Sequence, residues 1–261
     1  MTHKGYRCVK VEEPVAGVLK VVLARPKHLN AVNGDMIDDL LSLSDEIVSG
    51  YPDRYRAIVL SGEGRAFCSG GDIDFFRTLM DEPKNAVESV IARFHLFARI
   101  WYQLPLPTIA VLSGAAAGGG AALALLCDIR YAAPDAKIGF SFVNIGLVPD
   151  FGTHFLLPAL AGRDKALELM YSGDFVSAED AARIGLITRI FPRESAESEA
   201  IAFAARLAGK SPDVLRSIKK LSGEARNLSL TEVLAREVET QAGRFKTPEF
   251  EAHVRDFLAR R

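Results

Sequence analysis

Two glycine-rich stretches hold the residues best suited to chemistry on a carbonyl group. In "VLSGEGRAFCSGGDIDFF" a strand-like run ends at Ser61, and Gly70 and Gly71 precede a helix that opens near Asp72. In "IAVLSGAAAGGGAAL" a second strand-like run is followed by glycines at 118–120, at the head of another helix. Glycine permits close backbone approach and positive φ, and the first N–H groups of a helix lack internal partners. We call each of these glycine-rich strand-to-helix junctions a glycine corner. Two such corners facing each other would direct two N–H donors at one oxygen atom and form an oxyanion hole.

Other uses of these corners stay open from the pattern alone. Glycine-rich junctions between strands and helices also occur in α/β proteins without a catalytic role. A phosphate loop is disfavoured because GxxxxGK[ST] is absent. The segment "GAAAGG" lies near the dinucleotide fingerprint, but Asp128 comes too early to hold a ribose, so no nicotinamide cofactor is expected. Ser113, Asp128 and His154 lack the spacing of a nucleophile elbow, which disfavours a serine hydrolase.

The elements that must position the corners alternate between strands and helices. Residues 6–13 and 18–25 are strand-like and are separated by Pro14 and Gly17, which predicts a hairpin. Residues 36–48 carry apolar side chains at helical spacing, whereas residues 56–62 and 108–114 indicate buried strands that end in glycine turns. Residues 137–142 offer a further short strand. This succession predicts an α/β fold of βα units around a mostly parallel sheet.

The pattern becomes helical from Ala161 onward. The segments "SAED" from Ser177 and "SLTE" from Ser229 match the box in which serine caps a helix whose third residue is acidic. Thr247 before Pro248 predicts another helix start, because proline is favoured at the first helical position. We predict an α/β core over residues 1–195 and a helical extension over residues 196–261, of the kind that covers a subunit interface.

Composition and charge narrow the functional classes. The 261 residues are 49% hydrophobic and 25% charged, as in ordinary globular proteins. The 32 basic and 33 acidic residues give a formal net charge of -1, which favours neither nucleic acid nor an anionic membrane as a partner. Residues 107–127 are uncharged over a membrane-spanning length, but their glycines, proline and strand-like start argue against a transmembrane helix. Three scattered cysteines and an N-terminus without a signal-like core predict a cytoplasmic protein with no metal site.

Six segments together resemble the enoyl-CoA hydratase/isomerase (crotonase) family. In chain order they are "RPKHLNAV", "GEGRAFCSGGDI", "SGAAAGGGAALALLCDIRYA", "IGLVPDFGTHFLLPALAG", "SGDFVSAEDAARIGLI" and "EFEAHVRDFLARR". The match is collinear over nearly the whole chain and is therefore far more specific than any one motif. It implies a crotonase-like spiral of βαβ units and a homotrimer or dimer of trimers. It also implies an acyl-CoA thioester as substrate, with no cofactor besides the CoA of that substrate.

The resemblance also assigns residues around the thioester. The two N–H groups that polarise its carbonyl would belong to Gly71 and Gly119. Loss of one such donor typically costs about 3 kcal/mol of transition-state stabilisation, because the enolate carries its charge on that oxygen. The remaining contacts implied for CoA are Lys27, His28 and Leu29 along the channel, Ser69, Asp72 and Ile73 beside the adenine and pantetheine, and Phe257 and Arg260 at the CoA site of a neighbouring subunit.

Two positions depart from the hydratases of the family. Those enzymes orient water with two glutamates, and the corresponding residues here are Ala122 and Phe142. Neither side chain can carry a proton, which disfavours the hydration mechanism. Asp150 in "GLVPDFGTHF" occupies the position where isomerases of the family place an acid/base aspartate, although Pro-Asp before Phe-Gly is also ordinary turn sequence.

We therefore predict an enoyl-CoA isomerase in which Asp150 moves a proton between C2 and C4 of the acyl group. Apolar neighbours, namely Val148, Phe151 and Phe142, should disfavour its charged form and make it a better base. The alternatives are a hydratase that orients water with Asp150 alone and an acyl-CoA-binding protein without catalysis. We interpret His154 as structural and Cys68 as a packing residue. An apolar acyl pocket is expected from Trp101, Phe140, Phe142, Phe151, Phe155 and the helix from Asp72 to Met80.

Overall fold

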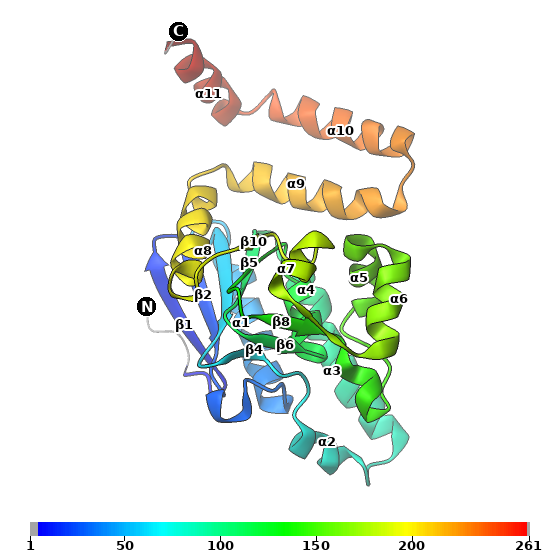
Figure 1. The fold of residues 1–261 in the computed structure, drawn as a ribbon. Helices are drawn as coiled ribbons and strands as arrows, with labels where there is room; N and C mark the ends of the chain where they lie inside the picture. The colour runs from blue at the N-terminus through cyan, green and yellow to red at the C-terminus, as the bar shows by residue number, and fades with distance from the viewer. Residues whose placement is uncertain (1–4, 260–261) are drawn as a thin grey trace. The chain divides into compact units, whose positions relative to one another are not determined.

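The computed structural model describes residues 5–259, in which the strands form two sheets (Figure 1). The larger contains β1 (Val9–Val15), β2 (Val18–Leu23), β3 (Ala57–Gly62), β5 (Thr108–Leu112), β7 (Ile129–Ala132) and β10 (Arg189–Ile190), adjacent in that order. Only β1 and β2 pair antiparallel there. The smaller contains β4 (Ala66–Cys68), β6 (Ala115–Ala117), β8 (Lys137–Gly139) and β9 (Phe175–Ser177), with β9 antiparallel. The predicted hairpin and mostly parallel sheet are confirmed.

Helices connect these strands in the predicted alternation. They are α1 (Gly34–Gly50), α2 (Ile73–Leu79), α3 (Lys84–Tyr102), α4 (Gly119–Leu125), α5 (Thr153–Ala161), α6 (Arg163–Ser172), α7 (Ala178–Arg183) and α8 (Arg193–Ala208). The predicted cap at Ser177 is confirmed, because its side chain accepts the N–H of Asp180 at 3.1 Å. Short 3-10 helices occupy Pro26–His28 and Ser141–Ile145, so the predicted strand over residues 137–142 ends at Gly139.

Helix α8 covers one face of the six-stranded sheet (Figure 1). Its buried side chains are all alanine and recur at every fourth position, from Ala196 to Ala208. They pack with Val18, Ala57, Val59, Ile109, Val111 and Tyr131 of the sheet. Small side chains at i and i+4 share one helix face and let the helix approach the sheet closely. The chain accordingly divides into compact units between Lys210 and Ser211, after α8, whereas the sequence suggested 195/196.

The opposite sheet face forms the main core. Alternate strand residues such as Leu19, Val21, Ile58 and Leu60 are fully buried there together with the apolar face of α1. The α1 residues in this core are Met36, Ile37, Leu40, Leu43 and Ile47, which confirms the helix predicted over residues 36–48. Strands β4 and β6 contribute Phe67, Cys68 and Ala116 to the same core. The short strands that carry the glycine corners are therefore anchored in well-packed surroundings.

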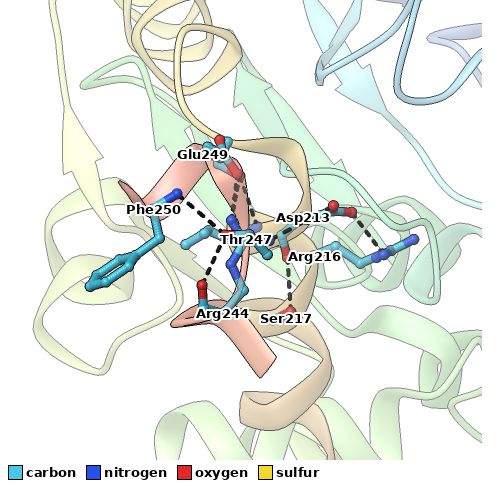
Figure 2. Close-up of polar contacts among 9 residues, drawn as sticks. Asp213, Arg216, Ser217, Arg244, Thr247, Glu249 and Phe250 are labelled. Carbon is cyan, nitrogen blue, oxygen red and sulfur yellow. Dashed lines mark hydrogen bonds and ion pairs between the residues drawn. The ribbon is translucent and has the colours of Figure 1, made fainter. Parts of the chain in front are cut away.

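The second compact unit consists of α9 (Pro212–Glu224), a short 3-10 helix, α10 (Leu230–Arg244) and α11 (Pro248–Ala259). The predicted starts of α10 and α11 are confirmed, with a complete capping box between Ser229 and Glu232. Arg244 pairs with Glu249 and lies 3.8 Å from Asp213. Figure 2 shows these side chains. None of these three helices buries a residue within the single chain. Within residues 5–259 no helix has the length and apolar character needed to cross a membrane.

Candidate active site

The two glycine corners lie next to each other because β4 and β6 pair in parallel. Cα partners in this pairing include Cys68 with Ala116, which aligns the chain segments that lead into the two corners. A Cβ atom built on Gly119 would lie 3.8 Å from the backbone nitrogen of Gly71. The structure thus brings together Gly71 and Gly119, the two residues assigned to the thioester carbonyl.

The packing at both corners requires glycine. A Cβ atom on Gly120 would come within 2.2 Å of the Cys68 carbonyl oxygen, and one on Gly71 within 2.1 Å of the Phe76 ring. Gly70 and Gly118 have positive φ angles of 97° and 49°. The constraint at Gly120 comes from the close approach of the two segments, whereas that at Gly71 comes from the Phe76 side chain of α2, which follows Gly71 in the chain.

The backbone N–H groups of Gly71 and Gly119 are available to a ligand. Their neighbours are satisfied, since Asp72 N–H donates to the Val32 carbonyl at 2.9 Å and Gly118 N–H donates to the Gly139 carbonyl at 2.8 Å. Within the described part of the chain, Gly71 and Gly119 donate no backbone hydrogen bond. Two unused N–H donors on glycines that are neighbours in space can together stabilise a developing negative charge on an oxygen atom.

The predicted CoA residues of the first two motifs also meet. The Leu29 carbonyl accepts the N–H of Ser69 at 3.0 Å, and the backbone carbonyl of His28 accepts the Ser69 hydroxyl at 3.3 Å. Leu29 has a positive φ of 50°, which turns the chain after the 3-10 helix Pro26–His28. The Lys27 and His28 side chains are exposed and accessible to a phosphate-bearing ligand.

Asn30 holds this loop in place, a role that sequence reasoning did not assign. It is fully buried with a φ of 58°, and its side-chain amide donates to the carbonyls of Glu63, Ala66 and Phe67 at 3.0, 2.9 and 3.2 Å. Its side-chain oxygen accepts the N–H of Arg25 at 3.0 Å. Asparagine tolerates the left-handed region better than most residues, and this loop uses that property.

Asp72 and Ile73 differ in their surroundings. The Asp72 carboxylate is buried, accepts from Arg25 at 2.8 Å and caps α2 through the N–H groups of Asp74 and Phe75. Ile73 is 55% exposed and free to contact a ligand. The structure therefore gives Asp72 a local structural task, namely fixing the chain immediately after Gly71. Its predicted contact with CoA stays a prediction, as does that of Ile73.

Replacement of Asp72 with asparagine is expected to lower the free energy of unfolding by about 1–3 kcal/mol at neutral pH. Burial alone would raise the pKa of Asp72, but hydrogen bonds from Arg25 and the α2 backbone outweigh it and lower that pKa. The stabilisation is therefore complete above about pH 4 and is lost as the pH falls through the lowered pKa. Urea unfolding of both proteins at pH 7 and pH 3 checks this, with Asp74→Asn, at an 84% exposed side chain, as the matched control. An equal deficit at both pH values would contradict the prediction.

Asp150 lies in the turn before α5. Its carbonyl accepts both the N–H and the hydroxyl of Thr153, at 2.9 and 2.6 Å, and Thr153 is fully buried. Phe151 and Gly152 follow with positive φ angles of 54° and 78°. A left-handed phenylalanine is strained and persists only where its surroundings hold it. Here Phe151 is buried against Phe94 and Phe97, so its packing fixes the adjacent carboxylate.

His95 on α3 is the residue that sequence reasoning missed. Its Nε2 atom lies 3.5 Å from Oδ2 of Asp150, and its ring meets Phe151 edge-on. Burial raises the pKa of Asp150, and the proximity of His95 opposes that rise without cancelling it. A signal in the sequence existed, because His95, Ala98, Arg99 and Tyr102 recur at helical spacing. These four side chains line a pocket of about 270 Å³ together with Leu126, Phe151, Gly152, Phe155 and Leu156.

The predicted apolar environment is confirmed in part. Phe151 is buried next to Asp150 in the chain, but Val148 is 74% exposed and does not shield Asp150 within the chain. Phe142 is buried, and its predicted place beside Asp150 stays a prediction. Trp101, expected in the acyl pocket, is fully buried in the core against Phe97. The large apolar side chain at that helix position is needed for packing between α3 and its neighbours.

The two positions that lack glutamate are apolar and buried. Ala122 on α4 is fully buried, and Phe142 is 8% exposed. Cys68 is also buried, which raises the pKa of its thiol to about 12 and suits a packing residue rather than a nucleophile. His154 is exposed on α5. Asp150, in contact with His95, is thus the predicted acid/base residue, whereas the carboxylate of Asp72 beside Gly71 is engaged by Arg25 and the start of α2.

Two predicted CoA contacts belong to the terminal helix. Phe257 lies on α11 in the second compact unit and is 60% exposed. Arg260 lies outside the described residues. Both contacts with a neighbouring subunit stay predictions.

Comparison with known proteins gives concordant matches over more than nine-tenths of the chain. A family profile described as enoyl-CoA hydratase/isomerase matches residues 13–261. The 1,2-epoxyphenylacetyl-CoA isomerase of Escherichia coli K12 is 34% identical, with 94% of this chain and 93% of the relative covered. The crotonyl-CoA hydratase of Syntrophomonas wolfei is 31% identical, with 91% of this chain and 90% of the relative covered.

Solved structures show the same fold. The enoyl-CoA hydratase of Bacillus anthracis superposes with a TM-score of 0.91 at 27% identity, covering 98% of this chain and 97% of its own. The fold class expected from the sequence, an α/β spiral of βαβ units with C-terminal helices, is confirmed.

Proposed function

Because the chain belongs to the enoyl-CoA hydratase/isomerase family, whose members act on acyl-CoA thioesters, we propose that it is an isomerase that shifts a carbon–carbon double bond of an enoyl-CoA. The observation that carries this proposal is the contrast between one retained acid/base group and two apolar replacements. Asp150 is half-buried beside His95, whereas Ala122 and Phe142 are buried and cannot handle protons. The isomerase named among the relatives supports the same choice.

The proposed reaction begins with the thioester carbonyl at the two glycine corners. The N–H groups of Gly71 and Gly119 would donate to its oxygen while Asp150 takes a proton from C2 of a 3-enoyl-CoA. The electron pair of that C–H bond forms the C1–C2 double bond of an enolate, whose negative charge rests on the oxygen. Return of a proton to C4 moves the C3–C4 double bond to C2–C3 and restores the carbonyl. Donors already in place stabilise this charge without reorganisation, which is the usual source of catalysis in such sites.

Recognition of CoA is assigned to the loop that the structure assembles around Ser69. Exposed Lys27 and His28 would lie beside phosphate groups, while Leu29, Ser69, Asp72 and Ile73 border the path toward Gly71. Phe142 would face the acyl group, and Phe257 and Arg260 would complete the CoA site of a neighbouring subunit. CoA is part of the substrate, so the proposal includes no separate cofactor.

A homotrimer or a dimer of trimers is part of the proposal. The helices after Lys210 expose large apolar side chains, among them Leu230 at 74% and Val238 at 70%. Apolar area of this kind favours coverage by another subunit.

The pH dependence of isomerisation should reflect the surroundings of Asp150. Burial raises the pKa of this carboxyl above its ordinary value of 3.8, although His95 opposes the rise. Asp150 must be ionised to accept the C2 proton, so kcat should increase with pH and level off above the raised pKa. A pH–rate profile in a buffer series of constant ionic strength measures that limb. A midpoint at or below 3.8 would show that Asp150 is not the group that limits the rate.

Two assays separate isomerisation from the second candidate, a hydratase that orients water with Asp150 alone. This candidate is kept because the matched relatives include a crotonyl-CoA hydratase. A 3-enoyl-CoA should give the 2-enoyl product, seen as a rise in conjugated-thioester absorbance. A 2-enoyl-CoA incubated in heavy-oxygen water should gain no label at C3, because only hydration adds water there. Label at C3 without isomerisation would establish the hydratase, and absence of both reactions and of C2 deuterium exchange would leave an acyl-CoA-binding protein.

A further inference from the structure

The contact between His95 and Asp150 joins two elements that are distant in the sequence. His95 lies in α3, and Asp150 lies in the turn before α5. In the described part of the chain, His95 is the basic side chain within 4.0 Å of the Asp150 carboxylate. The separation of 3.5 Å is longer than a strong hydrogen bond, but contacts of this type tighten when substrate binds.

Both side chains of this contact reach solvent in the structure. His95 is 48% exposed and Asp150 37% exposed. The pocket beside His95 is lined mostly by apolar side chains, and its one charged side chain is Arg99, a turn further along α3. The edge contact with Phe151 holds the ring plane. The imidazole would therefore keep Asp150 connected to water when a bound acyl group covers the carboxylate itself.

Resting on the isomerase function proposed above, we infer that His95 exchanges protons between Asp150 and solvent during the double-bond shift. It acts through Asp150 as a positioning and proton-exchange residue and does not contact the acyl group. The proton removed from C2 would leave by this route, and the proton delivered to C4 would be drawn mostly from water.

The proton balance of the exchange closes without another reactant. Asp150 takes H⁺ from C2 and becomes a carboxylic acid. It passes that proton to Nε2 of neutral His95, and Nδ1–H releases a proton to water, which leaves the other neutral tautomer. In the return step Nε2–H gives its proton to Asp150 while Nδ1 takes one from water, and Asp150 delivers a proton to C4. One proton has gone to solvent and one has come from it.

The test is isomerisation of an unlabelled 3-enoyl-CoA in deuterium oxide, followed by mass spectrometry of the first product formed. The unmodified protein should place deuterium at C4 in most turnovers. His95→Gln keeps a hydrogen-bonding group beside Asp150 but removes proton exchange, so most product should carry the substrate's own C2 proton at C4. The kcat of this variant should fall by about 10- to 100-fold, which is less than the loss typical of a group that transfers the proton to or from the substrate directly. His154→Gln, at an exposed histidine of α5, is the matched control and should behave like the unmodified protein.

A second variant covers the possibility that His95→Gln folds poorly. His95→Ala with added imidazole should regain deuterium at C4, because the small base can take the place of the half-exposed side chain. If the unmodified protein isomerises and His95→Gln places the same share of deuterium at C4, the proton route is refuted while the isomerase function stands. If the unmodified protein does not isomerise at all, the proposed function itself fails and this inference with it.

Discussion

Replacement of Asp150 with asparagine is expected to lower kcat for conversion of a 3-enoyl-CoA to the 2-enoyl isomer by about 10²- to 10⁴-fold, the usual contribution of a positioned acid/base group. The amide retains the size of the side chain and one accepting oxygen but cannot accept the C2 proton. Exchange of C2 hydrogens in deuterium oxide should fall by the same factor, because enolate formation is the step that requires the base. Coupled measurement of absorbance and exchange checks both effects.

Folding and CoA binding should survive that substitution. Burial raises the pKa of Asp150, so the fold disfavours its ionised form, and a neutral amide should not reduce the free energy of unfolding at neutral pH. Calorimetry with a saturated acyl-CoA should give an affinity close to that of the unmodified protein. Asp164→Asn, at a fully exposed carboxylate of α6, is the matched control. Wild-type isomerase activity in Asp150→Asn would remove this residue from the mechanism.

Local signals in the sequence predicted most of the elements. The hairpin of β1 and β2 and the caps at Ser177 and Ser229 depend on neighbouring residues and are confirmed in the structure. The two glycine corners are local patterns of the same kind. Their approach is not, because it depends on pairing between β4 and β6, each three residues long. Strands of that length are too short to show alternation, so only family resemblance could indicate that Gly71 and Gly119 meet.

The site residues that sequence reasoning missed depend on contacts between distant segments. His95 meets Asp150 only because α3 passes beside the turn before α5, and nothing adjacent to either residue encodes that contact. Trp101 shows the reverse error, since an aromatic residue on the same helix was assigned to the pocket but faces the core. The buried residues of α3, Phe94, Phe97, Ala98 and Trp101, recur at helical spacing, so this pattern was a signal that Trp101 faces the core.

Replacement of Gly119 with alanine is expected to lower kcat/KM for isomerisation by about 10²- to 10³-fold, the typical loss when one oxyanion donor is disabled. The added Cβ would lie 3.8 Å from the nitrogen of Gly71, in the space that the thioester oxygen must enter to reach both N–H groups. The loss follows from blocking the oxygen, since the N–H of residue 119 is itself retained. Steady-state rates with a 3-enoyl-CoA, together with C2 exchange, measure it.

The same substitution should leave the fold intact, which makes the test specific. Gly119 has no positive φ, and the nearest atom to its added Cβ is at an ordinary contact distance. Gly120→Ala, by contrast, would drive its Cβ to 2.2 Å from the Cys68 carbonyl oxygen and should lose stability along with activity. Gly209→Ala at the end of α8, with its nearest atom at 3.6 Å, is the control for a harmless extra methyl group. Activity of Gly119→Ala near that of Gly209→Ala would contradict an oxyanion hole at this corner.

Combining Gly119→Ala with Asp150→Asn tests whether the two residues serve one step. If the N–H of Gly119 stabilises the enolate that Asp150 creates, either substitution alone removes most of the rate enhancement for enolate formation. The double variant should then lose much less than the product of the two single losses, as expected for groups that act as a unit. Fully multiplicative losses would mean that Gly119 aids substrate binding independently of proton removal. The difference between the loss in the double variant and the product of the single losses is therefore informative. It measures how much of the contact to the oxyanion is made in the transition state for C2 deprotonation rather than in the bound thioester.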